Sequence, residues 1–219
     1  MASRIMHYAI ADQIAAAIPI QNREKFLLGN LEPDISGKAD GSYDRAHFSE
    51  ENAEKGTKGI NWRTFVDKYQ ENILEDDELL GYLCHLIADA CWLKRIRETH
   101  IRIFSGEKRK EMNRQGYEEM RRYNPVLIEQ YGLRNEIQSM EAIGDFQAEE
   151  INPECKEQFL AGLAADFAVE KEPENRFVVY PYAEVMEYME FCVEKIIAEI
   201  SALRKKETLS NPEEFYILI

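Results

Sequence analysis

The chain has 219 residues and a formal net charge of −14, from 41 acidic and 27 basic residues. Apolar residues make up 45 % of the composition, which is enough for one sizeable hydrophobic core. The negative surface repels nucleic-acid phosphates, and no stretch approaches the roughly 20 apolar residues of a membrane-spanning helix, so we expect neither a nucleic-acid partner nor a transmembrane segment.

Residues 3–18 have the apolar spacing of an amphipathic helix. His7, Ile10, Ile14 and Ile18 form one stripe at successive spacings of 3, 4 and 4, which places an imidazole on the buried face. A short helix is expected over residues 23–28, stopped by Gly29. The turn that follows carries Asp34 directly after a stiffening proline.

Residues 35–59 are polar and rich in glycine, without a sustained apolar period. We expect one long loop here, with His47 in its middle. Loops of this length in compact domains tend to be functional or disordered.

The next two helices contain the most apolar part of the chain. Asn61 can cap the first of them, and its inner face would carry Trp62, Phe65, Val66, Tyr69 and Ile73. The second begins at Asp76 or Asp77 and runs towards Phe104. Its segment 79–92 is apolar nearly all round, which is typical of a helix at the centre of a bundle.

The remaining sequence also favours helices. They are expected over residues 107–123, 125–143 (after a break at Asn124-Pro125), 152–169 and 181–206. Residues 176–180 fit either a short strand or a turn, and the apolar tail, 215–219, is expected to dock on the core. The sequence therefore predicts an all-α, single-domain multi-helix bundle over residues 1–219, with a metal site between helices and one long loop.

Cysteine usage and the N-terminus indicate the compartment. Asp12 and Gln13 interrupt the apolar run near the N-terminus and only Arg4 precedes it, which argues against a secretory signal peptide. The four cysteines are scattered without a C-x-x-C pair, as expected for reduced thiols. We therefore expect a cytoplasmic protein.

His85 and Asp89 are the first candidate metal ligands. Four residues apart on a helix, their side chains share one face about 5–6 Å apart at Cβ, and both can reach one zinc ion at roughly 2.0–2.2 Å. An unpaired Asp89 on this apolar helix would carry a large desolvation cost, and no Lys or Arg lies one turn before it. Such a pair alone is more often a hydrogen-bonded pair or a solvated edge than a metal site.

His7, His47 and Asp34 extend the candidate set. Each also has an ordinary interpretation, as a core histidine, a surface histidine and an Asx-turn residue respectively. No spacing rule joins them to the helix pair, so the motifs taken singly suggest a metal site without establishing it.

Four segments taken in chain order carry a resemblance: residues 6–11 (MHYAIA), 26–34 (FLLGNLEPD), 46–48 (AHF) and 81–89 (GYLCHLIAD). Together they resemble the zinc-dependent phospholipase C family of bacteria, whose wider superfamily includes zinc-dependent single-strand nucleases. The Phe-x-x-Gly-x-x-x-Pro-Asp and Gly-Tyr-x-x-His-x-x-x-Asp blocks are the specific parts. The resemblance covers roughly the first hundred residues.

The resemblance implies a ligand set and a chemistry. His7, Asp34, His47, His85 and a bridging Asp89 would hold zinc inside an all-helical bundle. The reaction implied is hydrolysis of a phosphate ester, in which zinc lowers the pKa of bound water from 15.7 to about 7. Asp34 would be the catalytic residue that orients or deprotonates this water.

The sequence also departs from the family pattern. Secreted members bind three zinc ions, with help from the mature N-terminal amine, a histidine after the helix aspartate and a His-x-x-x-Glu pair. Here six residues precede His7, and only His100 lies downstream of Asp89, with Phe104 four residues beyond it. We therefore expect one or two zinc ions.

Three functions follow from this pattern. The first is a phospholipase C-like zinc hydrolase, a phosphodiesterase acting on a small-molecule or lipid phosphoester. The second is a phosphomonoester or nucleotide hydrolase on the same metal scaffold, and the third is a non-catalytic helical protein with a structural metal. An open coordination position would support hydrolysis, whereas a closed tetrahedral site would support a structural role.

Overall fold

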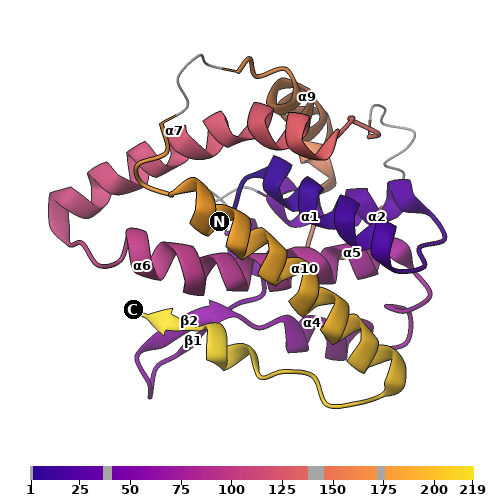
Figure 1. Ribbon diagram of the computed structural model, residues 1–219. Coiled ribbons are helices and arrows are strands. Elements are labelled where there is room, and N and C mark those ends of the chain that lie inside the picture. Colours follow the sequence, from indigo (N-terminus) through magenta and orange to yellow (C-terminus); the bar gives the residue numbers. More distant parts are fainter. Residues whose placement is uncertain (1, 37–40, 138–145, 172–175) are drawn as a thin grey trace.

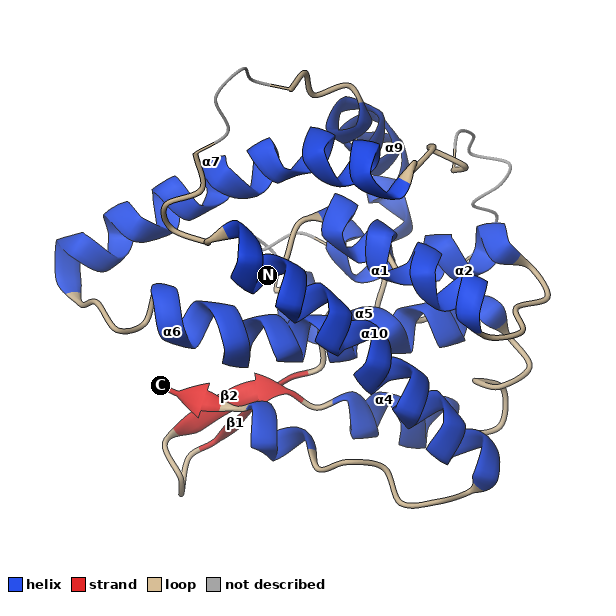
Figure 2. Cartoon of the chain, viewed as in Figure 1, coloured by secondary structure: helices blue, strands red, loops and turns tan. Residues whose placement is uncertain are grey.

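The computed structural model describes residues 2–36, 41–137, 146–171 and 176–219, and helices dominate it, as the all-α prediction expected (Figures 1 and 2). The helices are α1 (Arg4–Ala17), α2 (Arg23–Gly29), α3 (Ser42–Ala46), α4 (Trp62–Tyr69), α5 (Asp77–Trp92), α6 (Glu98–His100), α7 (Gly106–Tyr131), α9 (Lys156–Phe167) and α10 (Tyr182–Lys205). Short turns of 3₁₀-helix are η1 (Glu32–Ile35), η3 (Pro153–Cys155) and η4 (Pro212–Phe215), and η2 (Leu93–Arg97) is one turn of π-helix.

Helix α5 lies at the centre of the bundle. Every residue from Glu78 to Trp92 is buried, which agrees with its apolar sequence. The carboxylate of Asp76 caps the helix by accepting hydrogen bonds from the amides of Glu78 and Leu79 at 2.8 and 3.4 Å. Helices α1, α2, α4 and α10 pack around it, and α10 crosses in front of it in Figure 1.

Helices α2 and α5 approach backbone to backbone. A Cβ atom at Gly81 would lie 2.1 Å from the carbonyl oxygen of Phe26 and 2.8 Å from the amide nitrogen of Asn30. A Cβ at Gly29 would lie 1.8 Å from the carbonyl oxygen of Glu78. Two glycines are therefore required here, and the close approach holds the turn after α2 against the face of α5.

The prediction of one long loop over residues 35–59 was wrong in part. Residues 37–40 lie outside the described ranges, but the rest contains α3 and the antiparallel strands β1 (Ser49–Asn52) and β2 (Thr57–Ile60). Strand β3 (Ile217–Leu218) adds to β2 in the register Lys58↔Ile217. The sequence gives no strand pattern here for two reasons: the outer strand of this small sheet is polar, and its third strand comes from the far end of the chain.

Helix α7 corrects a second prediction. It continues through Pro125 to Tyr131, where a break at Asn124-Pro125 was expected. The helix tolerates the proline because tertiary contacts hold the helical turn that contains it. Asn124, the residue before the proline, is buried, accepts a hydrogen bond from Ser3 and donates one to Asp166. Residues 133–137 leave the helix, and the end of the expected 125–143 helix lies outside the described residues.

Residues 178–180 form a bend and not a strand, which agrees with the turn that the sequence left open as an alternative. The bend turns successive amides towards one side chain: the buried carboxylate of Glu119 accepts hydrogen bonds from the amides of Val178, Val179 and Tyr180 at 2.8–3.0 Å. Glu119 therefore supplies the acceptors that a neighbouring strand would have supplied.

Other predicted helices are confirmed with small changes at their ends. Ser3 caps α1 through its hydroxyl, and Asn61 caps α4 through its side chain, although α4 ends at Tyr69 and leaves Ile73 in a later turn. The helix that begins with α5 continues through η2 and α6 to His100, close to the expected end.

The C-terminal tail docks on the core in part: Tyr216 and Ile217 are buried, whereas Leu218 and Ile219 are exposed. A hydrogen bond from the amide of Ser210 to the buried carboxylate of Glu199 (3.1 Å) ties the tail to α10, and Lys195 Nζ pairs with the same carboxylate at 2.8 Å. In the described part of the chain, no helix is long and apolar enough to cross a membrane.

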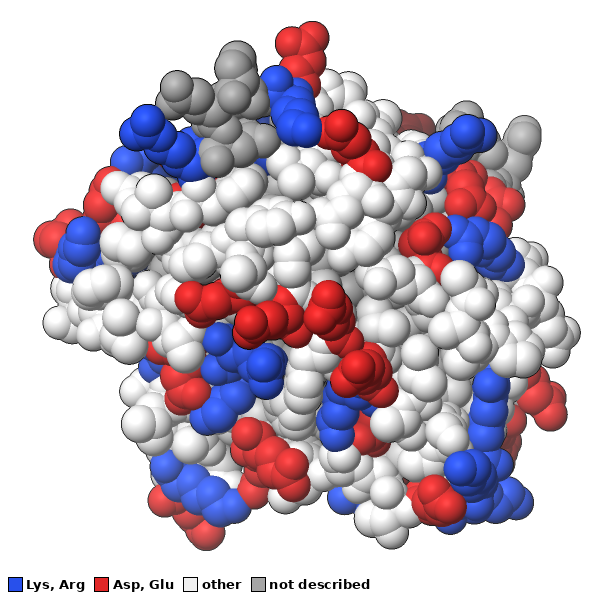
Figure 3. All heavy atoms as spheres, viewed as in Figure 1, with Lys and Arg blue, Asp and Glu red and all other residues white. Residues whose placement is uncertain are grey.

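Charge is unevenly distributed over the surface. On the face shown in Figure 3, acidic and basic side chains are interspersed and wide areas carry neither. The net charge of −14 therefore leaves room for local groups of basic residues.

Candidate metal centre

Five predicted side chains meet inside the bundle. His7 comes from α1, Asp34 from η1, His47 from the residue that ends α3, and His85 and Asp89 from α5. Helical geometry places the last two on one face, while the three others arrive from separate turns of chain. The structure thus brings together the whole set, although no sequence spacing joined it.

Asp89 lies at the middle of the cluster. Its Oδ1 is 3.2 Å from Nε2 of His7, and its Oδ2 is 3.4 Å from Nε2 of His85 and 3.5 Å from Nε2 of His47. Asp34 joins through Oδ1, 3.6 Å from Nε2 of His47. Two overlapping groups have donor atoms close enough for one ion, namely His7 with His85 and Asp89, and Asp34 with His47 and His85.

Backbone carbonyls fix the orientation of two imidazoles. Nδ1 of His85 lies 2.8 Å from the carbonyl oxygen of Asn30, and Nδ1 of His47 lies 2.8 Å from that of Tyr43. A carbonyl only accepts, so we assign the proton of each neutral ring to Nδ1. Both Nε2 atoms then present lone pairs to the cluster, which is the usual arrangement of metal-binding histidines.

Three features of the cluster fit a bound cation. Nε2 of His47 and Nε2 of His85 face each other at 3.2 Å, and two lone pairs at this distance repel unless a positive charge lies between them. Oδ2 of Asp89 and Nδ1 of His7 are buried and make no hydrogen bond within the described residues. Imidazole nitrogens and carboxylate oxygens are ligands that zinc accepts.

The electrostatics of the cluster favour ionised carboxylates. Burial alone would raise the pKa of Asp89, but the polar imidazoles of His7 and His85 around it hold this pKa well below its usual range. Burial likewise opposes ionisation of Asp34, but the neighbouring imidazoles, His47 first among them, lower its pKa to about 2. Two anionic ligands would therefore meet the metal.

Burial also acts on the imidazoles. It lowers the pKa of His7, and the neighbouring charge of His85 lowers it further. The rings of these two histidines are stacked, with centroids 3.8 Å apart and an interplanar angle of 13°. A neutral His7 is the form that can bind a metal. The donor set therefore suits zinc, which either of the two overlapping ligand groups would hold.

The centre opens to solvent on one side only. The side chains of His7, His47, His85 and Asp89 have no exposure, whereas that of Asp34 is 16 % exposed. Asp34 borders a pocket of about 390 Å³ whose walls come mainly from α1 and α7; they include Ser3, Arg4, Tyr43, Met120, Arg121, Asn124 and Asp166.

Sequence reasoning did not find the residues that support the ligands. The carbonyl oxygens of Asn30 and Tyr43 carry no side-chain signal, and the ring of Tyr43, stacked on that of His47 at 4.0 Å, lay in the presumed loop. Arg121, in the pocket beside Asp34, was also missed. Only tertiary contacts reveal these roles.

His100, most of the nearby aromatic residues and the four cysteines are not metal ligands in this arrangement. His100 pairs with Glu184 at 2.7 Å and takes no part in either ligand group. The nearby aromatic residues mostly serve packing. The hydroxyl of Tyr82, on α5, donates to the carbonyl of Ala46 and so links α5 to the last residue of α3. Cys84, Cys91 and Cys192 are buried and Cys155 is half-buried, and all four are free thiols.

The family comparison agrees with this geometry. The model of the family described as zinc dependent phospholipase C matches residues 6–133, which is more than half of the chain. No curated protein and no solved structure matches the chain. The matched range contains the five clustered side chains, which are positioned to hold a metal ion, and zinc is the metal of this family. The chain therefore belongs to the zinc-dependent phospholipase C family.

Proposed function

We propose that the protein is a zinc-dependent phosphoric ester hydrolase, acting as a phosphodiesterase on a small-molecule or lipid substrate. The observation that carries this proposal is the asymmetry of the metal centre. Four of its five donors are sealed in the bundle, while Asp34 faces a pocket of about 390 Å³. A donor set that opens on one side suits a catalytic metal, because a catalytic site keeps a position for substrate or water.

The proposed ligands are His7, Asp34, His47, His85 and Asp89. Bound there, zinc supplies Lewis acidity that polarises a phosphoryl oxygen and acidifies water. The histidines and Asp89 serve to hold the ion in a dry site, where its field is strong. The carbonyls behind His47 and His85 keep both rings turned towards it.

Asp34 is the proposed catalytic residue. A carboxylate whose pKa is lowered to about 2 is a weak base at neutral pH. It stays an anion and a good hydrogen-bond acceptor, so holding a water in position suits it better than removing a proton. This role needs exposure to the pocket, which Asp34 alone among the five has.

The pocket also offers a cation for the phosphate. Arg121 lines it and forms no ion pair with any described carboxylate, whereas Arg4, in the same wall, pairs with Asp166 at 2.7 Å. A guanidinium that pairs with no described carboxylate, in the pocket that Asp34 borders, suits an anionic phosphoester. It does not choose between a diester and a monoester, so a phosphomonoester or nucleotide hydrolase remains the nearest alternative.

A structural metal is the other alternative. The complete burial of four donors favours it, because structural zinc sites are closed. The two readings differ at Asp34, whose loss should matter for catalysis more than for folding.

The test is to compare wild type with Asp34→Asn and with Asp67→Asn, an exposed control on α4. Metal content is measured by mass spectrometry, and hydrolysis is measured on bis(p-nitrophenyl) phosphate, p-nitrophenyl phosphate and phospholipid. We expect zinc in wild type and a loss of about 100-fold or more in kcat for Asp34→Asn, with Asp67→Asn unchanged.

Two results would count against the proposal. A zinc-loaded wild type that hydrolyses none of these esters would favour the structural metal. Full activity of Asp34→Asn would show that the catalytic residue lies elsewhere. Cytoplasmic localisation and the single-domain organisation over residues 1–219 stay predictions of the sequence.

A further inference from the structure

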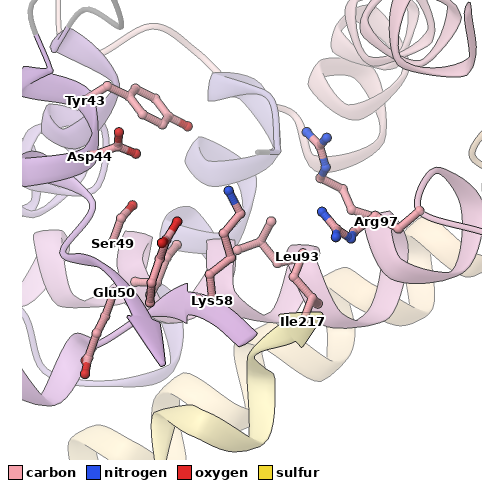
Figure 4. A pocket seen from close by; sticks show the side chains of 12 residues that line it. Tyr43, Asp44, Ser49, Glu50, Lys58, Leu93, Arg97 and Ile217 are labelled. Atoms are coloured by element: carbon pink, nitrogen blue, oxygen red, sulfur yellow. The ribbon is translucent and has the colours of Figure 1, made fainter. Parts of the chain in front are cut away.

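A second pocket lies next to the metal centre and shares Tyr43 with the pocket at Asp34. Its volume is about 440 Å³, and three basic residues line it: Lys58 from β2, Arg97 from η2 and Arg102 from the turn after α6. Lys58 and Arg97 reach into the space from one side, and Tyr43 and Asp44 lie on the other (Figure 4).

Neutral groups hold these arginines in place. Arg97 donates to the side-chain oxygen of Asn113 at 3.0 Å, and Arg102 donates to the carbonyl of Leu218. Arg109, just behind, donates to the carbonyls of Phe104 and Arg102 at 2.7 and 3.2 Å. These contacts fix the guanidinium groups without neutralising their charge.

No described carboxylate forms an ion pair with Lys58, Arg97, Arg102 or Arg109. Burial lowers the pKa of Arg102, and the charges of Arg109 and Arg97 lower it further. Glu98 opposes this shift, but its carboxylate pairs with Lys94 Nζ at 2.7 Å. The cluster therefore keeps like charges close together in a protein whose net charge is −14.

Acidic residues also line the pocket, but they do not cancel the cluster. Glu50 points away from the space in Figure 4 and bonds to Tyr216 (3.0 Å) and Asn61. Asp44 and Glu51 are exposed; Asp44 lies on α3, and Glu51 on β1 is the cross-strand neighbour of Lys58. The uncompensated positive charge of the pocket is therefore that of Arg97 and Arg102, on the wall formed by η2 and the turn after α6.

We propose that this pocket binds a phosphate group, held by the guanidinium groups of Arg97 and Arg102 and the ammonium group of Lys58. The planar fork of a guanidinium matches the oxygens of a phosphate, and a lysine adds a point charge. None of the metal ligands lines this pocket, so the phosphate is distinct from the one that would be cleaved. It belongs either to an anionic lipid headgroup or to a soluble phosphate compound.

Binding of inorganic phosphate to the full-length, zinc-loaded protein is the direct test, measured by isothermal titration calorimetry. Arg97→Gln/Arg102→Gln should weaken binding by about tenfold or more, since two charge-assisted contacts are lost. The matched control is Lys110→Gln/Arg114→Gln, which removes two exposed charges already paired on α7. Any phosphate that binds at the metal centre should bind equally to both double variants, so the difference between their phosphate affinities reports on this pocket alone.

Two single variants sharpen the test. Lys58→Gln changes an exposed side chain that forms no hydrogen bond or ion pair within the described residues, so the variant should fold normally and bind phosphate several-fold more weakly. Asp44→Asn removes a negative charge from the opposite wall and should strengthen binding. The proposal would be overturned if Arg97→Gln/Arg102→Gln and Lys58→Gln both bound phosphate within twofold of the control. It would also be overturned if the two single variants, Asp44→Asn and Lys58→Gln, both had the affinity of wild type.

Vesicles distinguish the source of the phosphate. Sedimentation with phosphatidylglycerol vesicles, but not with phosphatidylcholine vesicles, that is lost in Arg97→Gln/Arg102→Gln would assign the pocket to anionic headgroups. Phosphate binding without any vesicle binding would assign it to a soluble compound. Both results are independent of hydrolysis, so a failure of the proposed catalytic function would leave them readable.

Discussion

Replacement of Asp89 by asparagine tests the metal centre most directly. The side chain is fully buried, and its two oxygens lie 3.2–3.5 Å from the Nε2 atoms of His7, His85 and His47. Asparagine keeps the shape and one carbonyl oxygen, which can still accept the amide of Ala2 now bonded to Oδ1 at 3.1 Å. The change therefore removes one negative charge and one ligand oxygen with little change in packing.

The expected magnitude follows from linkage. Zinc at a thousand times its dissociation constant stabilises the folded state by about 4.1 kcal/mol. For a chain of this size 1 kcal/mol corresponds to about 2–4 °C, so zinc should raise the Tm of wild type by about 8–16 °C. A ligand loss that weakens binding about 100-fold leaves zinc at ten times the new constant. The stabilisation then falls to about 1.4 kcal/mol, or about 3–6 °C.

The assay is thermal unfolding followed by circular dichroism, in zinc and in EDTA, for wild type, Asp89→Asn and the exposed control Asp67→Asn. The control should keep the full zinc-dependent rise. An equal rise in wild type and Asp89→Asn would refute the assignment of Asp89 as a ligand. A wild type that gains no stability from zinc would refute the whole centre.

Three further predictions concern the scaffold. Gly81→Ala should lower the free energy of unfolding by about 3 kcal/mol in urea titrations, since the new Cβ meets backbone atoms. Gly162→Ala is the control, because its Cβ meets only the flexible end of Arg4 and should change the free energy of unfolding little. Equal effects of the two substitutions would contradict this prediction. Glu119→Ala should cost about 3 kcal/mol in the same assay, because buried amides lose their acceptor; a cost below 1 kcal/mol would mean that water replaces the carboxylate. Burial opposes ionisation of Glu199, but the hydrogen bonds from Lys195 and Ser210 lower the pKa of this carboxyl below 4.5. The ionised carboxylate therefore stabilises the folded state above pH 4.5, and this stabilisation is lost as the pH falls through the lowered pKa. The Tm difference between wild type and Glu199→Gln should therefore be larger at pH 7 than at pH 3, and a difference that does not change with pH would be inconsistent with this.

Prediction of the fold from sequence worked where the signal is local. Apolar spacing and capping residues located α1, α2 and α10 and the start of α5 to within a residue or two, because helix formation depends on neighbours three and four positions away. It failed where partners are distant in sequence. Residues 178–180 bend around the carboxylate of Glu119 and do not form a strand, and Pro125 stays inside α7, where the buried Asn124 beside it bonds to Ser3 and Asp166.

The candidate site divides in the same way. The pair His85 and Asp89 could be recognised from sequence, because a helix alone sets their spacing, and the family resemblance added His7, Asp34 and His47. The sequence by itself thus determined which side chains can bind a metal. Only the tertiary structure decided that the five converge, that carbonyls turn two imidazoles inward, and that Asp34 alone opens to a pocket. The carbonyl behind His85, for example, belongs to Asn30, which the backbone approach of α2 and α5 at Gly29 and Gly81 holds in place, and that approach is a property of two packed helices and of no single segment.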